Sequence, residues 1–380
     1  MSNKLISDVL LEVAGAIESG NFGKKIKVGL TTLGSEHGSE NLINGAKLAN
    51  NGMFEIVLIG KGDEEFTSYE VETEDEMYKV MEELLDSKEI DACVTMHYNF
   101  PIGVSTVGRV LTPGRGREMF IATTTGTSST DRVEAMARNA IYGIATAKSC
   151  GIKNPTVGIL NLDGARQVEK ILLNIKENGY EFDFAESMRA DGGSVMRGND
   201  LLIGVPDVMV TDSLTGNLLM KVFSSFNTGG DFEAQGFGYG PGVGEDYDRR
   251  VLILSRASGT PVVANALKYA FEIAKGEVNK IAREEYKKAI SFGLDKEFAE
   301  LKNKKAPKDK VEEIVAPPKE VVTEGIAGVD ILDLEDAVKA LWKESIYAES
   351  GMGCTGPIVM VAPEKLEIAI ECLKKNDFIK

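Results

Sequence analysis

The chain has 380 residues, and its 43 basic and 59 acidic side chains give a formal net charge of −16 with both histidines neutral. An apolar content of 43% is typical of a globular protein with a sizeable core, so the composition excludes a chain that is disordered throughout. The negative charge argues against nucleic acid and anionic membranes as partners. It also requires that any anionic substrate be held by a local site.

No apolar run reaches the roughly 18–20 residues that a membrane-spanning helix needs. Apolar residues near the N-terminus recur at helical spacing, which predicts a helix within residues 1–24 rather than a signal peptide. The four cysteines show no C-x-x-C or Cys/His ligand spacing. We therefore expect a cytoplasmic protein without a metal site, a cofactor or disulfides.

Short apolar runs recur between residues 26 and 255, and they are continuous rather than alternating, as in strands buried on both faces. These predicted strands lie at 26–30, 54–60, 91–96, 119–124, 156–162, 207–212 and 250–255. The amphipathic stretches between them predict helices, most clearly at 40–50, 75–87, 131–149 and 167–179. Strand–helix alternation predicts an α/β fold with a mostly parallel, doubly wound sheet in three layers.

The amino-acid composition changes after residue 294. Residues 295–325 are dense in charge and contain Pro307, Pro317 and Pro318, which is typical of an exposed linker. A small α/β module follows over residues 326–380, with a helix at 334–349, a loop at 350–357, a strand at 358–362 and a helix at 363–375. We thus expect a main α/β region at 1–294, a linker and a C-terminal module.

Three of the strand-to-helix turns are rich in hydroxyl groups. Ligands of parallel sheets collect at such turns, because free backbone N–H groups there favour anions. The candidate phosphate or acyl ligands are Gly34, Ser35 and His37 in the first turn, Gly126, Thr127 and Ser128 in the second, and Asp212, Ser213, Thr215, Gly216, Asn217 and Lys221 in the third. The same residue types are common helix caps, so a structural role is the alternative at each turn. No Walker loop or dinucleotide fingerprint is present, which argues against nucleotide binding.

The segment SGMGCTGP in the C-terminal module holds a candidate nucleophile, Cys354. The glycines around it leave the sulfur unobstructed, and backbone N–H groups near Gly353, Thr355 and Gly356 suit an oxyanion. A thiolate accepts acyl groups readily as a thioester. Against this, the segment follows a predicted helix C-terminus, whose dipole disfavours a thiolate, and it precedes an apolar strand instead of following one. The other cysteines are expected to be structural: Cys93, Cys150 and Cys372.

Several segments together resemble the PlsX family of phosphate:acyl-acyl-carrier-protein acyltransferases. IKVGLTTLGSEHGSENL resembles the family's first strand and its Gly-Gly-Asp-His-like turn, and PTVGILNL resembles its Val-Gly-Leu-Leu-Asn strand. PDVMVTDSLTGNLLMK resembles the signature Asp-Gly-Phe-Thr-Gly-Asn-Val … Lys. The resemblance covers residues 25–275 in consistent order and implies a PlsX- or phosphotransacetylase-like fold. It carries the family's site onto Gly34, His37, Asp212, Thr215, Gly216, Asn217 and Lys221.

Two segments depart from the PlsX pattern: TTTGTSS, which keeps only Gly126, and TMHYNFPIG. PlsX also lacks the linker and the module with Cys354, so long-chain acyl-carrier-protein specificity is not expected. The Gly-Met-Gly-Cys-Thr-Gly-Pro segment instead resembles the alpha subunits of component C of the glycine/sarcosine/betaine reductase complex of amino-acid-fermenting anaerobes, a PlsX-like family, over essentially the whole chain.

This second resemblance implies that inorganic phosphate attacks an acetyl thioester on Cys354 and releases acetyl phosphate. It also implies a beta subunit of component C and a selenoprotein acyl donor as partners, and we expect an oligomer. The alternatives are a PlsX-type acyltransferase that uses acyl carrier protein and a non-catalytic scaffold subunit. A phosphotransacetylase that uses coenzyme A is disfavoured, because no basic patch for a nucleotide is evident in the sequence.

Overall fold

The computed structural model describes residue 13 and residues 25–190, 192–305, 314–329, 333–353, 356–376 and 378–379. Apart from residue 13, the helix expected within residues 1–24 lies outside this described part, as do Cys354 and Thr355. Every helix in the described part is too short or too polar to span a lipid bilayer.

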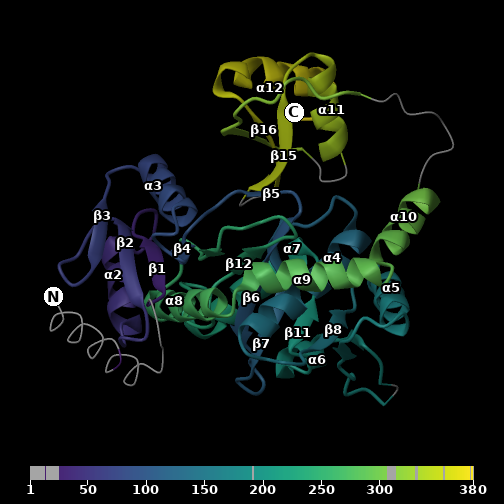
Figure 1. The fold of residues 1–380 in the computed structure, drawn as a ribbon, viewed down its shortest axis with the longest axis horizontal. Helices are drawn as coiled ribbons and strands as arrows, with labels where there is room; N and C mark the ends of the chain where they lie inside the picture. The colour runs from purple at the N-terminus through teal and green to yellow at the C-terminus, as the bar shows by residue number, and fades with distance from the viewer. Residues whose placement is uncertain are drawn as a thin grey trace, which may run out of the picture.

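The main sheet has twelve strands in the order β10-β8-β11-β7-β6-β12-β13-β4-β1-β2-β3, with β9 paired to β8 (Figure 1). All seven strands expected from apolar runs are present: β1 (Lys27–Thr31), β2 (Glu55–Gly60), β4 (Ala92–Thr95), β7 (Glu118–Thr127), β8 (Thr156–Leu160), β11 (Val208–Val210) and β13 (Val251–Ile253). The sequence patterns did not indicate the others: β3 (Thr67–Glu70), β6 (Val104–Leu111), β9 (Asp183–Phe184), β10 (Val195–Met196) and β12 (Gly240–Val243).

Helices cover both faces of this sheet. One face carries α2 (Gly38–Ala49), α4 (Arg132–Ser149), α5 (Ala165–Glu177), α8 (Thr260–Lys275) and α9 (Val278–Ser291), whose apolar side chains share one buried cluster. The other face carries α3 (Glu74–Asp86), α6 (Gly198–Ile203) and α7 (Ser213–Ser225), which contribute to a second cluster. The three-layer, mostly parallel α/β fold expected from the alternating pattern is confirmed.

The sheet contains two groups of parallel strands that do not share one direction. The pairings that join the groups, β7 with β6, β6 with β12 and β12 with β13, are all antiparallel. Three successive reversals leave β7, β11 and β8 running opposite to β13, β4 and β1. The carboxyl ends of the two groups therefore do not lie along one edge of the sheet. Helix α7 is important for the site because it connects the two groups.

The C-terminal module stands above the main sheet, drawn in yellow in Figure 1. It contains β14 (Glu324–Ala327), α11 (Leu334–Lys343), β15 (Ala348–Gly353), β16 (Gly356–Val361), a 3₁₀ turn (Pro363–Lys365) and α12 (Leu366–Lys375). Its antiparallel sheet, β14-β16-β15-β5, includes β5 (Phe100–Pro101) from the main region. The module is thus joined to the main region by strand pairing as well as by the chain.

Two expectations for this module are wrong. The helix expected over 334–349 ends at Lys343, where Ser345 takes a left-handed conformation (φ 60°) and turns the chain. Residues 348–353, expected as helix end and loop, form β15, because β16 and β5 supply hydrogen-bonding partners on both sides. Cys354 therefore follows a strand, and the objection that a helix C-terminus disfavours its thiolate no longer applies.

The segment expected as a linker contains regular structure at its start and its end. Residues Leu294–Lys305 form α10, which packs on α9 and α5 through the buried side chains of Leu294 and Phe298. At its other end, Glu324 begins β14. The division of the chain into 1–294, 295–325 and 326–380 stays a prediction.

Candidate functional site

Helix α7 lines two neighbouring cavities with different parts of its length. Its first turn lines the threonine cavity, a hollow of about 440 Å³ bounded by Thr123, Arg132, Ala135, Asn139 and residues 126–130 and 212–215. Asn217 and Lys221, further along the same helix, line the lysine cavity, which has a volume of about 250 Å³. The second and third hydroxyl-rich turns are thus brought together, and their predicted candidates, apart from Gly216, divide between the two cavities.

The threonine cavity lies at the N-termini of α4 and α7, and side chains cap both helices. The carboxylate of Asp131 accepts hydrogen bonds from two N–H groups of the first turn of α4. The carboxylate of Asp212 accepts from the N–H of Thr215 at 2.8 Å and pairs with the Arg132 guanidinium at 2.5 Å. The helix ends and the arginine that line this cavity are therefore largely compensated by carboxylates already present.

Gly216 has a packing role at the start of α7. A Cβ at this position would lie 1.7 Å from the carbonyl oxygen of Thr123, so only glycine lets the helix approach β7 this closely. The Thr211 hydroxyl donates to the same carbonyl at 2.9 Å and helps to fix the junction of β11 and β7. Gly216 thereby sets the position of the side chains that line both cavities.

The lysine cavity lies at the carboxyl ends of β4 and β13, under the C-terminal module. Its lining residues come from six parts of the chain: 96–98, Thr125, Asn217 with Lys221, Tyr239, 253–256, and Met352 with Gly353. Lys221 and Arg256 are the strong cations of this lining, and none of its described residues is a carboxylate. Such a surface suits an anion with more than one oxygen.

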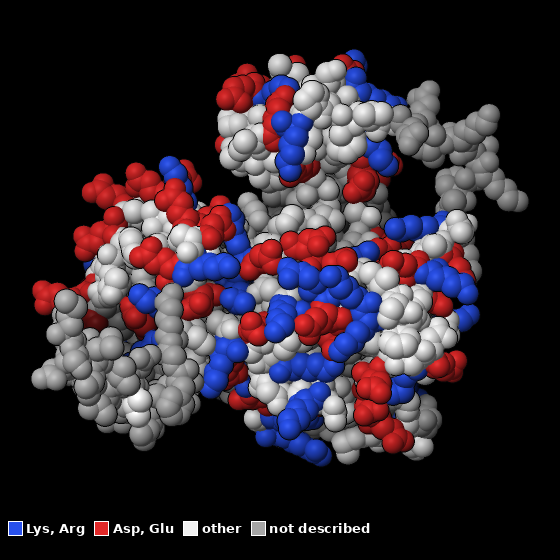
Figure 2. All heavy atoms as spheres, viewed as in Figure 1, with Lys and Arg blue, Asp and Glu red and all other residues white. Residues whose placement is uncertain are grey.

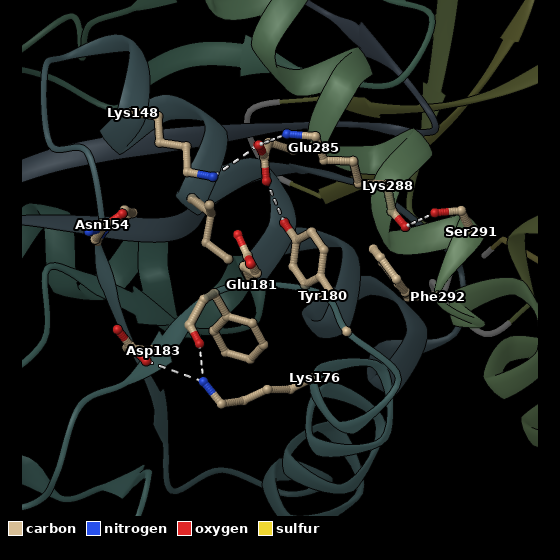
Figure 3. Close-up of a pocket in the computed structure, with 14 residues that line it drawn as sticks. Lys148, Asn154, Lys176, Tyr180, Glu181, Asp183, Glu285, Lys288, Ser291 and Phe292 are labelled. Atoms are coloured by element: carbon tan, nitrogen blue, oxygen red, sulfur yellow. Dashed lines mark hydrogen bonds and ion pairs between the residues drawn. The ribbon is translucent and has the colours of Figure 1, made fainter.

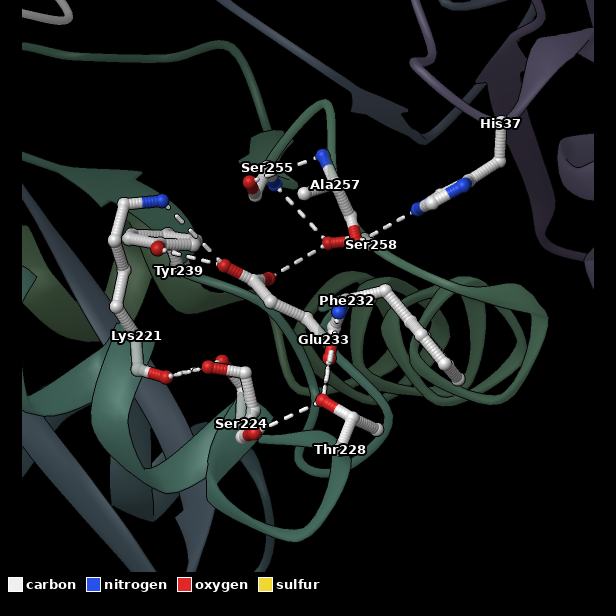
Figure 4. A network of polar contacts seen from close by, with 11 residues as sticks. His37, Lys221, Ser224, Thr228, Phe232, Glu233, Tyr239, Ser255, Ala257 and Ser258 are labelled. Atoms are coloured by element: carbon white, nitrogen blue, oxygen red, sulfur yellow. Dashed lines mark hydrogen bonds and ion pairs between the residues drawn. The ribbon is translucent and has the colours of Figure 1, made fainter. Parts of the chain in front are cut away.

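A buried carboxylate, Glu233, organises one side of this cavity (Figure 4). Glu233 is 3% exposed and accepts hydrogen bonds from the Tyr239 hydroxyl and the Ser258 hydroxyl, each at 2.9 Å. The Lys221 ammonium lies 3.7 Å from the same carboxylate while its side chain stays 55% exposed. Glu233 thus holds α7, the approach to β12 and the turn after β13 together, and it fixes Lys221 beside the cavity.

Arg256 forms the other side of the cavity and links it to the first hydroxyl-rich turn. Its guanidinium pairs with Glu74 at 2.9 Å and donates to the Gly34 carbonyl at 3.3 Å. His37 contacts the Ala257 carbonyl at 3.3 Å, and Ser35 accepts a hydrogen bond from the His37 N–H. The first turn therefore supports the Ser255–Ser258 turn, and neither cavity is lined by Gly34, Ser35 or His37.

The hairpin that carries the predicted nucleophile reaches the lysine cavity. Strand β15 ends at Gly353, which pairs with Gly356 at the start of β16, and Met352 pairs with Phe100 of β5. Met352 and Gly353 line the cavity together with Lys221 and Asn217. Cys354 follows Gly353 directly in the chain, although it and Thr355 lie outside the described residues.

The other three cysteines are held as thiols by their surroundings. Burial raises the pKa of Cys150 to about 12, and it also raises the pKa of Cys93 and of Cys372 from the ordinary thiol value. A thiol with a raised pKa supplies little thiolate near neutral pH. These cysteines are poor candidates for an acyl carrier, as the apolar positions of Cys93 and Cys372 predict.

His97 lines the lysine cavity next to Arg256. Burial lowers the pKa of His97, and the positive charge of Arg256 lowers it further, while Glu74 opposes the shift. The imidazole is therefore held in its neutral form near neutral pH.

A larger cavity, of about 680 Å³, lies away from these residues and is drawn in Figure 3. Its lysines are matched to carboxylates: Lys148 and Lys288 pair with the buried Glu285, and Lys176 pairs with Asp183. None of the predicted site residues that the structure describes lines it. Within the described part of the chain, no group of three or more His, Cys, Asp or Glu side chains is placed to hold a metal ion.

Sequence reasoning missed Arg256, Tyr239 and Glu233. The run 250–255 was identified as a strand, and the Ser-Arg-Ala-Ser-Gly that follows it is a fourth polar strand-to-helix turn of the kind already singled out. Glu233 lies in the glycine-rich segment 229–248, where no periodicity indicates that a carboxylate is buried. Only the folded chain brings it to Lys221.

Comparison with known proteins identifies the family. Residues 26–360 match the family described as "Fatty acid synthesis protein". The "Glycine/sarcosine/betaine reductase complex component C subunit alpha" of Peptoclostridium acidaminophilum is 63% identical over 374 residues, or 98% of this chain and 97% of that protein. A "Phosphate acyltransferase" of Thermotoga petrophila is 25% identical over 52% of this chain and 67% of its own.

Among solved structures, a branched-chain phosphotransacylase from Enterococcus faecalis V583 aligns with a TM-score of 0.47 at 16% identity, over 65% of this chain and 98% of its own. The family match and the 63% identical relative agree with the resemblance found in the sequence motifs. The chain therefore belongs to the fatty acid synthesis protein family, as a member of the group that includes the component C alpha subunit.

Proposed function

We propose that the chain is an acyltransferase that releases acetyl phosphate from an acetyl thioester on Cys354 by attack of inorganic phosphate. The observation that carries this proposal is the lining of the lysine cavity. Gly353, the residue bonded to Cys354, lines the same cavity as Lys221, Asn217 and Arg256. A nucleophilic sulfur and a cationic phosphate pocket belong within reach of each other in such a reaction.

In the proposed step, a phosphate oxygen attacks the thioester carbonyl and forms a new C–O bond. Negative charge develops on the carbonyl oxygen, where N–H groups around Gly353, Thr355 and Gly356 are the proposed donors. The tetrahedral intermediate then collapses, the C–S bond breaks and its electron pair leaves with the sulfur. The products are acetyl phosphate and the Cys354 thiolate, so no oxidant, reductant or metal is needed.

The phosphate is proposed to lie between the Lys221 ammonium and the Arg256 guanidinium, with the Asn217 amide as a further donor. The cationic members of two ion pairs face this place, and they favour an anion locally in a protein that carries a net −16. Glu233 is then a positioning residue, because its ion pair holds Lys221 and its two hydrogen bonds hold the surrounding turns. The threonine cavity, with Gly126, Thr127, Ser128, Ser213 and Thr215, is left for the acyl donor.

The name of the Peptoclostridium acidaminophilum relative extends the proposal to the partners. We infer that this chain acts as the alpha subunit of component C in a glycine, sarcosine or betaine reductase complex. A beta subunit and a selenoprotein that delivers the acetyl group are the proposed protein partners. A cytoplasmic location and an oligomeric state belong to the same proposal.

Acyl labelling of the full chain tests the proposal. After incubation with acetyl phosphate, mass spectrometry is expected to find one acetyl group on the peptide that contains Cys354. The Cys354→Ala variant is expected to lose this label, and the matched variant Cys372→Ala, in the same module, is expected to keep it. Phosphate-dependent turnover at the wild-type rate in Cys354→Ala removes the cysteine from the mechanism.

Acyl-donor specificity separates the remaining functions. A PlsX-type enzyme would prefer long-chain acyl groups on acyl carrier protein and would work without Cys354. A scaffold subunit would show neither acyl labelling nor arsenate-dependent breakdown of acetyl phosphate. Labelling together with arsenate-dependent breakdown is the result that the proposal expects.

A further inference from the structure

A basic cavity, here called the arginine cavity, lies at the ends of β4 and β13 opposite to the lysine cavity. It has a volume of about 550 Å³ and is bounded by Asp91, which precedes β4, by Arg249 and Arg250, which precede β13, and by the N-terminus of α9. Its lining contains five basic and three acidic side chains, although the whole chain is strongly acidic. Figure 2 shows basic and acidic side chains interspersed over the region of α9.

Most charges around the arginine cavity compensate one another. Arg249 pairs with Asp86 and Glu82, each at 2.8 Å. Lys280 pairs with Glu277 at 3.3 Å, and Arg283 pairs with Asp248. Among the described residues, this leaves two lining cations outside the ion pairs, Lys88 and Arg250, and Arg250 is the less exposed of the two.

Arg250 makes one weak hydrogen bond, from its Nη1 to the Asp91 carbonyl at 3.2 Å. Its Nε is buried and has no hydrogen-bond partner within the described residues. Burial lowers the pKa of Arg250 even though Asp91, Glu277 and Asp248 oppose this shift. A partly buried guanidinium in this state is stabilised strongly by an anion that accepts from Nε.

Asn279, in the first turn of α9, determines which hydrogen-bonding group a ligand needs in addition to an acceptor. Asn279 is 7% exposed, and its Nδ2 donates to the Tyr247 carbonyl at 2.8 Å, which fixes the orientation of the amide. The Oδ1 of the same amide is buried and has no partner among the described residues. A ligand at this place must therefore donate a hydrogen bond as well as accept one.

The N-terminus of α9 adds to the preference for an anion. Glu277 at the N-cap has a left-handed conformation (φ 52°), and its side chain does not cap the helix. The first-turn N–H groups thus keep the partial positive charge of an uncapped helix end beside Arg250. The helix end, the buried Nε and the buried Oδ1 are three separate features on one cavity.

We propose that the arginine cavity binds a phosphate group that retains one proton, either as inorganic phosphate or as a small phosphomonoester. The ionised oxygens accept from Arg250 Nε and the N-terminus of α9, and the remaining P–OH donates to Asn279 Oδ1. With a second pKa near 6, a phosphomonoester keeps such a proton in part of its population near neutral pH. A carboxylate has no donor in that range and leaves Asn279 unsatisfied. This site is independent of the function proposed for the lysine cavity.

Equilibrium dialysis of the full chain with radiolabelled inorganic phosphate tests the site. The background variant Lys221→Met with Arg256→Gln weakens the lysine cavity, so the remaining bound phosphate reports on the arginine cavity. We expect this background to bind one phosphate per chain, and Arg250→Gln added to it to weaken binding about tenfold or more. Arg115→Gln, at an exposed turn, is the matched control and is expected to change nothing.

Two further arms keep the test decisive. If Arg250→Gln does not fold, Arg250→Lys keeps the charge, removes the Nε donor and is expected to weaken binding several-fold. Glycerol 3-phosphate that displaces the label identifies a phosphomonoester site, and displacement by inorganic phosphate alone identifies a free-phosphate site. No phosphate bound in the background variant, or equal binding with and without the Arg250 substitution, overturns the proposal.

Discussion

The threonine and lysine cavities share helix α7 but differ in how their charges are compensated. In the threonine cavity, Arg132 and its partner Asp212 both belong to the lining, and carboxylates cap both helix ends. In the lysine cavity, the carboxylates that pair with Lys221 and Arg256 lie outside the lining. An anion therefore meets both members of the ion pair in the first cavity and mainly the cationic members of the ion pairs in the second. The number of hydroxyl groups in a turn is thus a poorer guide to an anion site than the placement of the counter-charges.

The largest expected effect comes from removing Lys221, one of the two strong cations of the lysine cavity. Lys221→Met is expected to lower phosphate-dependent release of acetyl phosphate about 100-fold or more, because a fixed charge next to the reacting oxygens is lost. Acyl labelling of Cys354 by a natural donor complex is expected to persist. Steady-state rates against phosphate concentration measure the effect, with the exposed Lys170→Met as the control. Equal rates in the two variants contradict the assignment of Lys221.

The next effect tests whether the position of α7, which lines both cavities, depends on the close contact between Gly216 and Thr123. Gly216→Ala forces a Cβ against the Thr123 carbonyl and is expected to lower the free energy of unfolding by about 2–3 kcal/mol. Gly198→Ala is the matched control, because a Cβ there meets nothing within 4 Å, and it is expected to change stability by less than about 1 kcal/mol. Urea unfolding measures both, and equal stabilities would mean that α7 does not depend on this close approach.

A smaller effect separates the cavities directly. Asn217→Ala in the lysine cavity is expected to raise the phosphate concentration for half-saturation about tenfold, the usual cost of a lost hydrogen bond to an anion. Ser213→Ala combined with Thr215→Ala in the threonine cavity is expected to change it less than about twofold, because Asp212 already caps the helix end there. The reverse order of effects moves the phosphate site to the threonine cavity.

The smallest effect concerns pH. Burial holds the pKa of His97 below its ordinary value of 6.5, so the folded state favours the neutral imidazole. The corresponding stability is fully present above pH 6.5 and is lost as the pH falls below that value, because the unfolded chain takes up the proton first. His97→Gln is expected to reduce the loss of stability between about pH 7 and 5. Urea unfolding at both pH values checks this, and an unchanged difference contradicts it.

Much of the fold could be predicted because its strands are buried on both faces and therefore appear as continuous apolar runs. Strand β12 could not, since its sequence Gly-Pro-Gly-Val has low β-propensity. It becomes a strand because Gly240, at φ 92°, passes within contact of the Val107 carbonyl, which no larger residue allows. The reversal of strand direction across the sheet depends on β12 and on β6. The sequence patterns indicated neither strand, so they could not predict the reversal.

The candidate site was predicted in part. Asn217 and Lys221 followed from the strand-to-helix turn and from the family resemblance, and both line the lysine cavity with Gly353. Glu233 did not, because its role depends on the glycine-rich segment 229–248 folding back to α7, and no pattern in that segment marks Glu233 as buried. The three turns do not share one cavity: the second and third line the two cavities, and the first supports the Ser255–Ser258 turn.

The most direct measurement is a single turnover of the chain acetylated on Cys354 and mixed rapidly with inorganic phosphate. Loss of the thioester should match formation of acetyl phosphate, and the rate should saturate with phosphate concentration, as for attack by a bound anion. A thioester that decays to acetate at a rate independent of phosphate would contradict the account.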